Sequence, residues 1–205
     1  MIGILDYGMG NLSSVRNALS FLQIENVILS SPDQIAGVSH MIIPGVGAFG
    51  AAMENIARAG FIDPIATFAN SGKPLLGICL GMQLLATEGT EPAICRGLDL
   101  IKGRVELLPS KNLSLPHMGW NGINLQSEHT ILEGVKMSAD FYFVHSFVFM
   151  PAYKSNVVTT TEYGTDFTSI ITNERRNVIG IQFHPEKSQK QGLKILDNFS
   201  KMSNA

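Results

Sequence analysis

The first half of the chain alternates short apolar runs with segments of helical periodicity. Apolar runs at residues 2–6, 27–29 and 40–43 predict buried strands, and so does the run that leads up to Cys79. Between them, apolar positions at helical spacing predict helices near residues 11–22 and 51–59, and Ser31-Pro32 predicts another helix start. This alternation is typical of a doubly wound, mostly parallel central sheet with helices on both faces, an α/β fold.

The second half of the chain changes to consecutive extended segments. They are predicted at residues 103–108, 122–125, 141–149, 156–161, 167–172 and 178–183. Residues 173–177 predict a hairpin turn between the last two segments, and a final helix is predicted near residues 190–202. We interpret the extra strands as antiparallel additions to the parallel sheet, within one domain that spans residues 1–205.

The stretch from Gly77 to Leu85 contains the strongest candidate for chemistry. Cys79 follows an apolar strand and has a glycine two residues away on each side, at Gly77 and Gly81. This is the spacing of a nucleophile elbow, a sharp turn from strand to helix that exposes one side chain. A helix that begins near Gly81 points its free N–H groups at the sulfur and favours the thiolate. The alternative interpretation is a buried core cysteine, a common setting for a free thiol.

A cysteine nucleophile needs a base, and His184 is the strongest candidate among the five histidines. It follows the predicted strand at 178–183, and in open α/β sheets the chemistry lies beyond the carboxyl ends of the strands. Glu186, two residues further on, can orient the imidazole, so we predict a triad of Cys79, His184 and Glu186. For His40, His117 and His129 a structural or surface role is the favoured interpretation.

The composition argues against several other functions. The net charge of −2 and the 16% of charged residues predict no basic surface for nucleic acid. No apolar run has the length that a bilayer span needs, and the two cysteines fit a reducing compartment, so we expect a cytoplasmic protein. Cys79 and Cys95 lack the spacing of zinc ligands, and neither a metal nor another cofactor is expected. Gly45 and Gly47 lack the rest of a phosphate loop, which leaves a plain turn or an oxyanion loop.

Several motifs together resemble those of the class I, triad-type glutamine amidotransferases. They are Pro44-Gly45-Val46-Gly47-Ala48-Phe49, Gly77-Ile78-Cys79-Leu80-Gly81-Met82-Gln83 and Gln182-Phe183-His184-Pro185-Glu186. The stretches 6–12, 116–121 and 142–146 resemble, more narrowly, the glutaminase subunits of histidine biosynthesis. The resemblance covers essentially the whole chain, and the combination of motifs is far more specific than any one of them.

The resemblance implies a role for each matching residue. Cys79 attacks the carboxamide of glutamine, His184 carries the proton, and Glu186 fixes the imidazole ring. The backbone N–H of Leu80, and that of Val46 after a local reorientation of its peptide, form the oxyanion hole. Glutamine is held by Gly47, Gln83 and the backbone at His145 and Ser146. The ammonia passes to a (β/α)8-barrel cyclase subunit in a heterodimer. This partner docks on the face around the triad, at Asn11, Met118, Trp120 and Lys187.

Some features leave alternatives open. Trp120 lies in a polar stretch that suits an interface anchor, and a core position is equally compatible with the sequence. Ser14 and Phe147 depart from the family pattern, where arginine and tyrosine are common. These departures leave room for another ammonia acceptor, such as a synthase that amidates bacterial surface sugars. A catalytically silent regulatory module on the same fold is the alternative from another class, and the intact triad argues against it.

Overall fold

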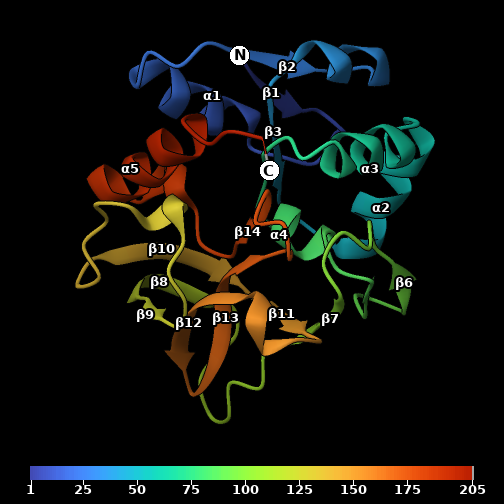
Figure 1. The fold of residues 1–205 in the computed structure, drawn as a ribbon. Helices are drawn as coiled ribbons and strands as arrows, with labels where there is room; N and C mark the ends of the chain where they lie inside the picture. Colours follow the sequence, from blue (N-terminus) through green and yellow to red (C-terminus); the bar gives the residue numbers. More distant parts are fainter. Residues whose placement is uncertain (205) are drawn as a thin grey trace.

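The computed structural model describes residues 1–204, which build a central eight-stranded sheet in the order β2-β1-β3-β4-β14-β13-β12-β9 (Figure 1). Its parallel part consists of β2 (Asn26–Leu29), β1 (Ile2–Leu5), β3 (His40–Gly45), β4 (Leu75–Cys79) and β14 (Val178–Ile181). All residues of β1, β3, β4 and β14 are buried. Strands that are covered on both faces need continuous apolar runs. This explains why the apolar runs in the sequence predicted these strands.

Helices cover both faces of the parallel strands, as Figure 1 shows. On one face α1 (Leu12–Phe21) and α5 (Gln189–Ser200) pack on side chains such as Ile42, while α2 (Phe49–Arg58) and α3 (Ile62–Asn70) pack on the other face, with Met41 and Ile43. Successive strand residues thus enter opposite cores, as the pleat requires. The predicted helices at 11–22, 51–59 and 190–202 are present. The segment after Ser31 forms the 3-10 helix η1 (Pro32–Gly37), and α3 was not expected from the sequence.

Antiparallel strands extend the central sheet beyond β14. They are β13 (Thr165–Thr172), β12 (Val157–Tyr163) and the short β9 (Asn124–Leu125). The predicted hairpin turn at residues 173–177 joins β13 to β14. The α/β fold with a mostly parallel central sheet and appended antiparallel strands is therefore confirmed.

Not every predicted strand joins this sheet, which corrects the interpretation of the second half. Two smaller sheets lie in the lower half of Figure 1. One pairs β10 (Asp140–His145) with β8 (His117–Gly122); the other contains β11 (Phe147–Pro151), β7 (Gly103–Leu107), β5 (Glu88–Gly89) and β6 (Cys95–Arg96). The predicted segment 141–149 is broken at Ser146, where the chain passes from the first small sheet to the second.

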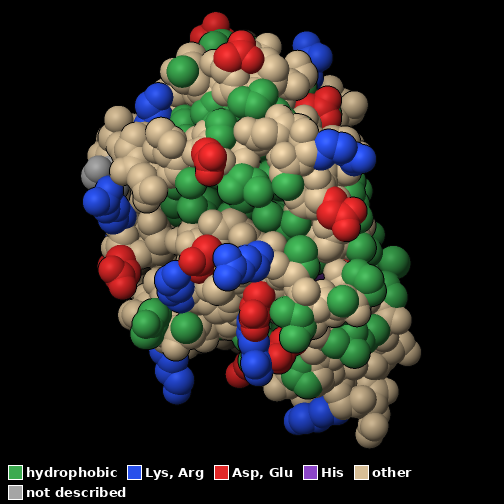
Figure 2. Space-filling model, turned by 90° about the vertical axis from the view of Figure 1, so that its right-hand side faces the viewer, with side chains coloured by type: hydrophobic (Ala, Val, Ile, Leu, Met, Phe, Trp, Pro, Cys, Tyr) green, Lys and Arg blue, Asp and Glu red, His purple; other side chains and the backbone are tan. Residues whose placement is uncertain are grey.

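The remaining short helices are α4 (Leu80–Leu84), η2 (Thr130–Leu132), η3 (Lys154–Asn156) and η4 (Pro185–Lys187). Among the described residues, no helix combines the length and the apolar character that a bilayer crossing requires. On the face that Figure 2 shows, acidic and basic side chains are interspersed with apolar ones, so neither sign of charge dominates it.

Candidate active site

Cys79 occupies a strained turn at the carboxyl end of β4. Its backbone has φ 55° and ψ −111°, and α4 begins at the next residue. A positive φ is unusual for a residue with a side chain, and such strain costs about 1–3 kcal/mol and concentrates at functional sites. The structure therefore places Cys79 in the strand-to-helix elbow that the Gly-x-Cys-x-Gly spacing predicts.

The two flanking glycines make this elbow sterically possible. A Cβ atom on Gly81 would lie 1.7 Å from the carbonyl oxygen of Ile43, and one on Gly77 would lie 2.4 Å from that of Gly81. Both distances are far inside van der Waals contact, so the elbow packs backbone against backbone. The helix that follows is only five residues long. A helix of this length offers its first free N–H groups and no extended helix dipole.

His184 and Glu186 form a buried pair at the end of β14. The distance from His184 Nδ1 to Glu186 Oε1 is 2.8 Å, and the two side chains are 3% and 1% exposed. Pro185 starts η4, and this turn brings Glu186 back to the imidazole. The backbone N–H of His184 donates to the carbonyl of Tyr142 at 2.9 Å, which ties the pair to β10.

The protonation of His184 follows from its two neighbours. Burial lowers the pKa of His184, but the interactions with Cys79 and Glu186 outweigh it and raise the pKa to about 9. His184 is therefore an imidazolium near pH 7. Since Nδ1 is bound to Glu186, Nε2 is the nitrogen left for Cys79, and among the described residues no hydrogen-bond acceptor competes for it.

One cavity of about 450 Å³ brings the predicted residues together. This size falls in the range of small-molecule sites. Its lining contains the predicted nucleophile and base, both predicted oxyanion residues and all four predicted glutamine contacts: Cys79, His184, Val46, Leu80, Gly47, Gln83, His145 and Ser146. Five further residues line it, namely Ala48, Glu91, Pro116, Val144 and Phe147. Glu186 lies behind His184 and does not line the cavity.

The side chains of two predicted glutamine contacts, Gln83 and His145, are hydrogen-bonded to other groups of the protein. Gln83 Nε2 donates to the carbonyl of Phe147 at 2.9 Å and to Gln182 Oε1 at 3.3 Å. His145 Nδ1 lies 3.0 Å from the same carbonyl of Phe147. These bonds occupy Gln83 Nε2 and the carbonyl of Phe147, and the carbonyl of Ser146 accepts from the N–H of Leu108 at 2.8 Å.

Three residues near the site have no role in the sequence analysis. Gln182 Nε2 donates to the sulfur of Cys79 at 3.8 Å, and Tyr7 donates from its hydroxyl to the carbonyl of Pro44 at 2.7 Å. Burial raises the pKa of Tyr7, and so does the nearby Cys79. Glu91 Oε2 accepts from the backbone N–H of Phe49 at 3.2 Å, at the start of α2. Gln182 belongs to the motif around His184, whereas Glu91 had no local signal.

The predicted docking residues are all exposed, and Trp120 and Lys187 lie against Tyr142, whose carbonyl accepts from the N–H of His184. Met118 and Trp120, on β8, are 62% and 49% exposed, so Trp120 is a surface residue and not a core residue. The Trp120 ring meets the Tyr142 ring edge-on at 5.9 Å, and Lys187 Nζ lies 5.6 Å from the Tyr142 centroid. Asn11 is exposed, and its side chain caps α1 by accepting from the N–H of Ser14 at 3.2 Å.

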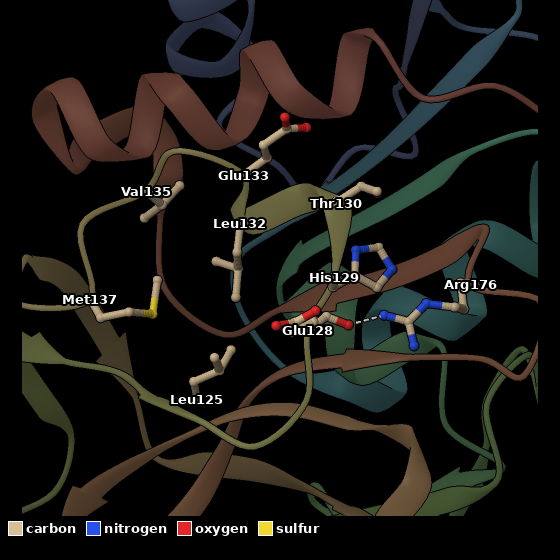
Figure 3. A pocket seen from close by; sticks show the side chains of 9 residues that line it. All are labelled: Leu125, Glu128, His129, Thr130, Leu132, Glu133, Val135, Met137 and Arg176. Carbon is tan, nitrogen blue, oxygen red and sulfur yellow. Dashed lines mark hydrogen bonds between the residues drawn. The ribbon is translucent and has the colours of Figure 1, made fainter.

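A second hollow, of about 520 Å³, lies near the opposite end of β14 (Figure 3). Apolar side chains gather on one side of it, and His129 and Arg176 lie on the other. His129 Nδ1 accepts from the N–H of Ile131 at 3.1 Å, and burial lowers the pKa of His129 to about 4. This neutral histidine therefore has a structural role. The lining contains no cysteine, and the described residues contain no cluster of three side chains suited to a metal ion.

Comparison with known proteins agrees with this geometry. The family described as "Glutamine amidotransferase class-I" matches residues 4–202. The chain is 44% identical over 201 residues to the imidazole glycerol phosphate synthase subunit HisH of Methanosarcina acetivorans, covering 98% of both chains. It is 46% identical over 199 residues to the HisH subunit of Aquifex aeolicus, covering 97% of this chain and 95% of the relative.

Solved structures show the same fold at lower identity. A structure of PurLQS from Thermotoga maritima matches with a TM-score of 0.77 at 20% identity, covering 97% of this chain and 96% of the other. A crystal structure of a glutamine amidotransferase matches with a TM-score of 0.75 at 20% identity, covering 97% and 98%. From its sequence relatives, the chain belongs to the class-I glutamine amidotransferases and, within them, to the HisH subunits of imidazole glycerol phosphate synthase.

Proposed function

We propose that the glutaminase reaction of this chain runs through Cys79, His184 and Glu186, and that its ammonia is delivered to the cyclase subunit of imidazole glycerol phosphate synthase. The observation that carries the proposal is the arrangement around the sulfur. Cys79 stands on a strained elbow in a cavity that it shares with His184, and Glu186 holds the far nitrogen of that histidine. A nucleophile, a base and an orienting group then act as one unit.

The reaction takes place in two halves. The thiolate of Cys79 attacks the side-chain carbonyl carbon of glutamine, a C–S bond forms, and the carbonyl oxygen becomes an oxyanion. The backbone N–H groups of Val46 and Leu80 stabilise this oxyanion. The C–N bond breaks as His184 gives its proton to the leaving ammonia, which leaves a glutamyl thioester. Water then attacks the thioester while His184 accepts a proton, and glutamate leaves as the C–S bond breaks.

The remaining lining residues hold the amino-acid part of glutamine. Glu91 supplies the one carboxylate among the described residues that line the cavity, so it is the natural partner for the α-ammonium group. Gly47, Gln83 Oε1 and the backbone at His145 and Ser146 bind the rest of the molecule. Glu91 also accepts from the N–H of Phe49, so the same carboxylate steadies the start of α2 next to the oxyanion loop.

The partner is a (β/α)8-barrel cyclase that forms a heterodimer with this chain. Asn11, Met118, Trp120 and Lys187 contact it, because these residues are exposed and include two large apolar side chains. A half-exposed tryptophan beside a tyrosine and a lysine is a typical interface anchor. Docking on this face places the ammonia acceptor next to the site where ammonia is released.

The test is the Cys79→Ala variant in complex with the cyclase subunit. Glutamine-dependent turnover should be abolished, since no other side chain in the cavity replaces the thiolate. Synthase activity with added ammonium salts should persist in the same variant, which shows that the complex is folded. Glutaminase activity near that of the wild type would rule out Cys79 as the nucleophile.

A further inference from the structure

A chain of hydrogen bonds through two buried histidines ends at the turn of residues 145–147. His117 and His145 are direct partners across the β8–β10 ladder. His117 Nδ1 lies 3.1 Å from His145 Nε2, and His145 Nδ1 lies 3.0 Å from the carbonyl oxygen of Phe147. At the other end, Asn121 Nδ2 lies 3.3 Å from His117 Nε2. We call these three side chains, Asn121, His117 and His145, the histidine relay.

The chemistry of the two ends determines the direction of every bond in the relay. A carbonyl oxygen only accepts, so His145 Nδ1 must carry the proton that it donates to Phe147. His145 Nε2 then accepts from His117 Nδ1, and His117 Nε2 accepts from Asn121. The amide of Asn121 is oriented in turn, because Nδ2 also donates to the carbonyl of Glu162 at 2.9 Å and Oδ1 accepts from the N–H of Gly122 at 2.8 Å. Only the Nδ1–H tautomer of both rings satisfies this chain.

The surroundings keep both rings neutral and in place. Burial lowers the pKa of His117 to about 4, and burial together with His117 lowers that of His145 to about 3. His117 is stacked between Tyr163 at 4.1 Å and Phe143 at 4.9 Å, centroid to centroid. A ring held between two aromatic faces cannot turn to find another partner, so the direction of the relay is stable near pH 7.

The relay ends on a backbone group that also supports the cavity. The carbonyl of Phe147 accepts from both His145 Nδ1 and Gln83 Nε2. Ser146 lies between the two ends of this turn and lines the cavity, whereas His117 and Asn121 do not line it. His117 therefore acts on the cavity only through His145.

We propose that His117 is a positioning residue for glutamine: by donating to His145 it sets the tautomer that holds the 145–147 turn in its binding shape. This inference rests on the proposed function, in which the turn binds glutamine. Without the His117 donor, Nε2 of His145 is a buried acceptor with no partner. If His145 changes tautomer instead, its bare Nδ1 faces the carbonyl of Phe147 and repels it. Either outcome releases the turn.

The test compares two substitutions at His117 in the complex with the cyclase subunit. His117→Phe keeps the aromatic stacking and removes both nitrogens, whereas His117→Asn keeps an N–H donor near the position of Nδ1. We expect His117→Phe to raise the KM for glutamine about tenfold while kcat stays within about threefold, the pattern of lost substrate binding. His117→Asn should recover most of this loss.

A matched control separates positioning from stability. His40 is also buried, and its ring lies 2.9 Å from Ser39 Oγ and 3.0 Å from the carbonyl of Met202, away from the cavity. His40→Phe should lower the Tm and leave the KM for glutamine unchanged. A wild-type KM in folded His117→Phe, or an equal rise in KM in His40→Phe, would overturn the inference. If the wild-type complex and Cys79→Ala hydrolysed glutamine equally, the proposed function itself would fail.

A spectroscopic measurement keeps the inference testable if His117→Phe does not fold. In the Cys79→Ala complex with ¹⁵N-labelled histidine, His117 and His145 should both show the Nδ1–H tautomer, and their nitrogen shifts should move when glutamine binds. An Nε2–H tautomer at either ring, or shifts that glutamine leaves unmoved, would contradict the positioning role.

Discussion

We expect Glu186 to set the charge state of His184, the proposed catalytic base, and Glu186→Gln tests that role with little change of shape. The substitution keeps an amide oxygen near His184 Nδ1 and removes the negative charge now 2.8 Å away. Because both side chains are nearly inaccessible to water, solvent screens this interaction little. Burial already lowers the pKa of His184, and Cys79 and Glu186 together raise it to about 9. Removal of one of these two partners must lower it.

The size of the change follows from the strength of the bond. A hydrogen bond to a charged group contributes about 1.5–3 kcal/mol. One pKa unit corresponds to about 1.4 kcal/mol, so the pKa of His184 should fall by about 1–2 units, to about 7–8. His184 must be protonated to give its proton to ammonia, so the rate falls as pH rises through this pKa. The alkaline limb of the rate profile should therefore move from about pH 9 to about pH 7–8.

The same shift affects stability with a defined sign. Since the pKa of His184 in the folded chain lies above its ordinary value of 6.5, the interaction stabilises the fold fully below about pH 6.5. This contribution is lost as pH rises through about 9. The Glu186→Gln variant should thus lose more stability at pH 6 than at pH 10.

The assay is kcat/KM for glutamine between about pH 6 and 10, on the complex with the cyclase subunit. Asp197→Asn is the matched control, because Asp197 also pairs with basic groups, Lys201 and Lys194, but does so on α5 away from the cavity. Its profile should coincide with that of the wild type. An alkaline limb that stays at the wild-type position in Glu186→Gln, or moves to higher pH, would refute the electrostatic role given to Glu186.

Two further predictions concern the second cysteine and the control of activity. Among the described polar groups, Cys95 contacts only the carbonyl of Arg96, and it lies outside the cavity. Cys95→Ser should therefore keep turnover within about tenfold, which corresponds to about 1.4 kcal/mol of activation barrier. Complete loss of activity in a folded variant would contradict this. The isolated chain should hydrolyse glutamine about a hundred- to a thousand-fold more slowly than the complex with bound nucleotide, because the loss of one aligned oxyanion donor lowers the rate by about that factor. Val46, the proposed donor, is exposed in a loop beside Gly47, whose φ is 105°. Assays of the chain alone, with its partner, and with partner and nucleotide check this, and equal rates in all three would exclude such a switch.

Local chemistry accounts for what the sequence by itself determined. Strands buried on both faces need continuous apolar runs, and β1, β3, β4 and β14 are such runs. The elbow at Cys79 depends on glycines two residues away on each side, where a Cβ would collide with backbone. Glu186 reaches His184 because only a single turn of chain separates them. All three features depend on residues that are close in sequence, so a short segment contains enough information to predict them.

Only the tertiary structure decided which distant segments meet. The alternation in β10 shows that Phe141, Phe143 and His145 face inward, but not that His145 meets His117 across a separate two-stranded sheet. Glu91 enters the cavity from a loop between short strands, with no motif to mark it. The physical reason is that burial periodicity shows that a face must be covered, and many apolar faces can cover it. The pairing is selected only when the whole chain packs and every buried donor and acceptor must find a partner.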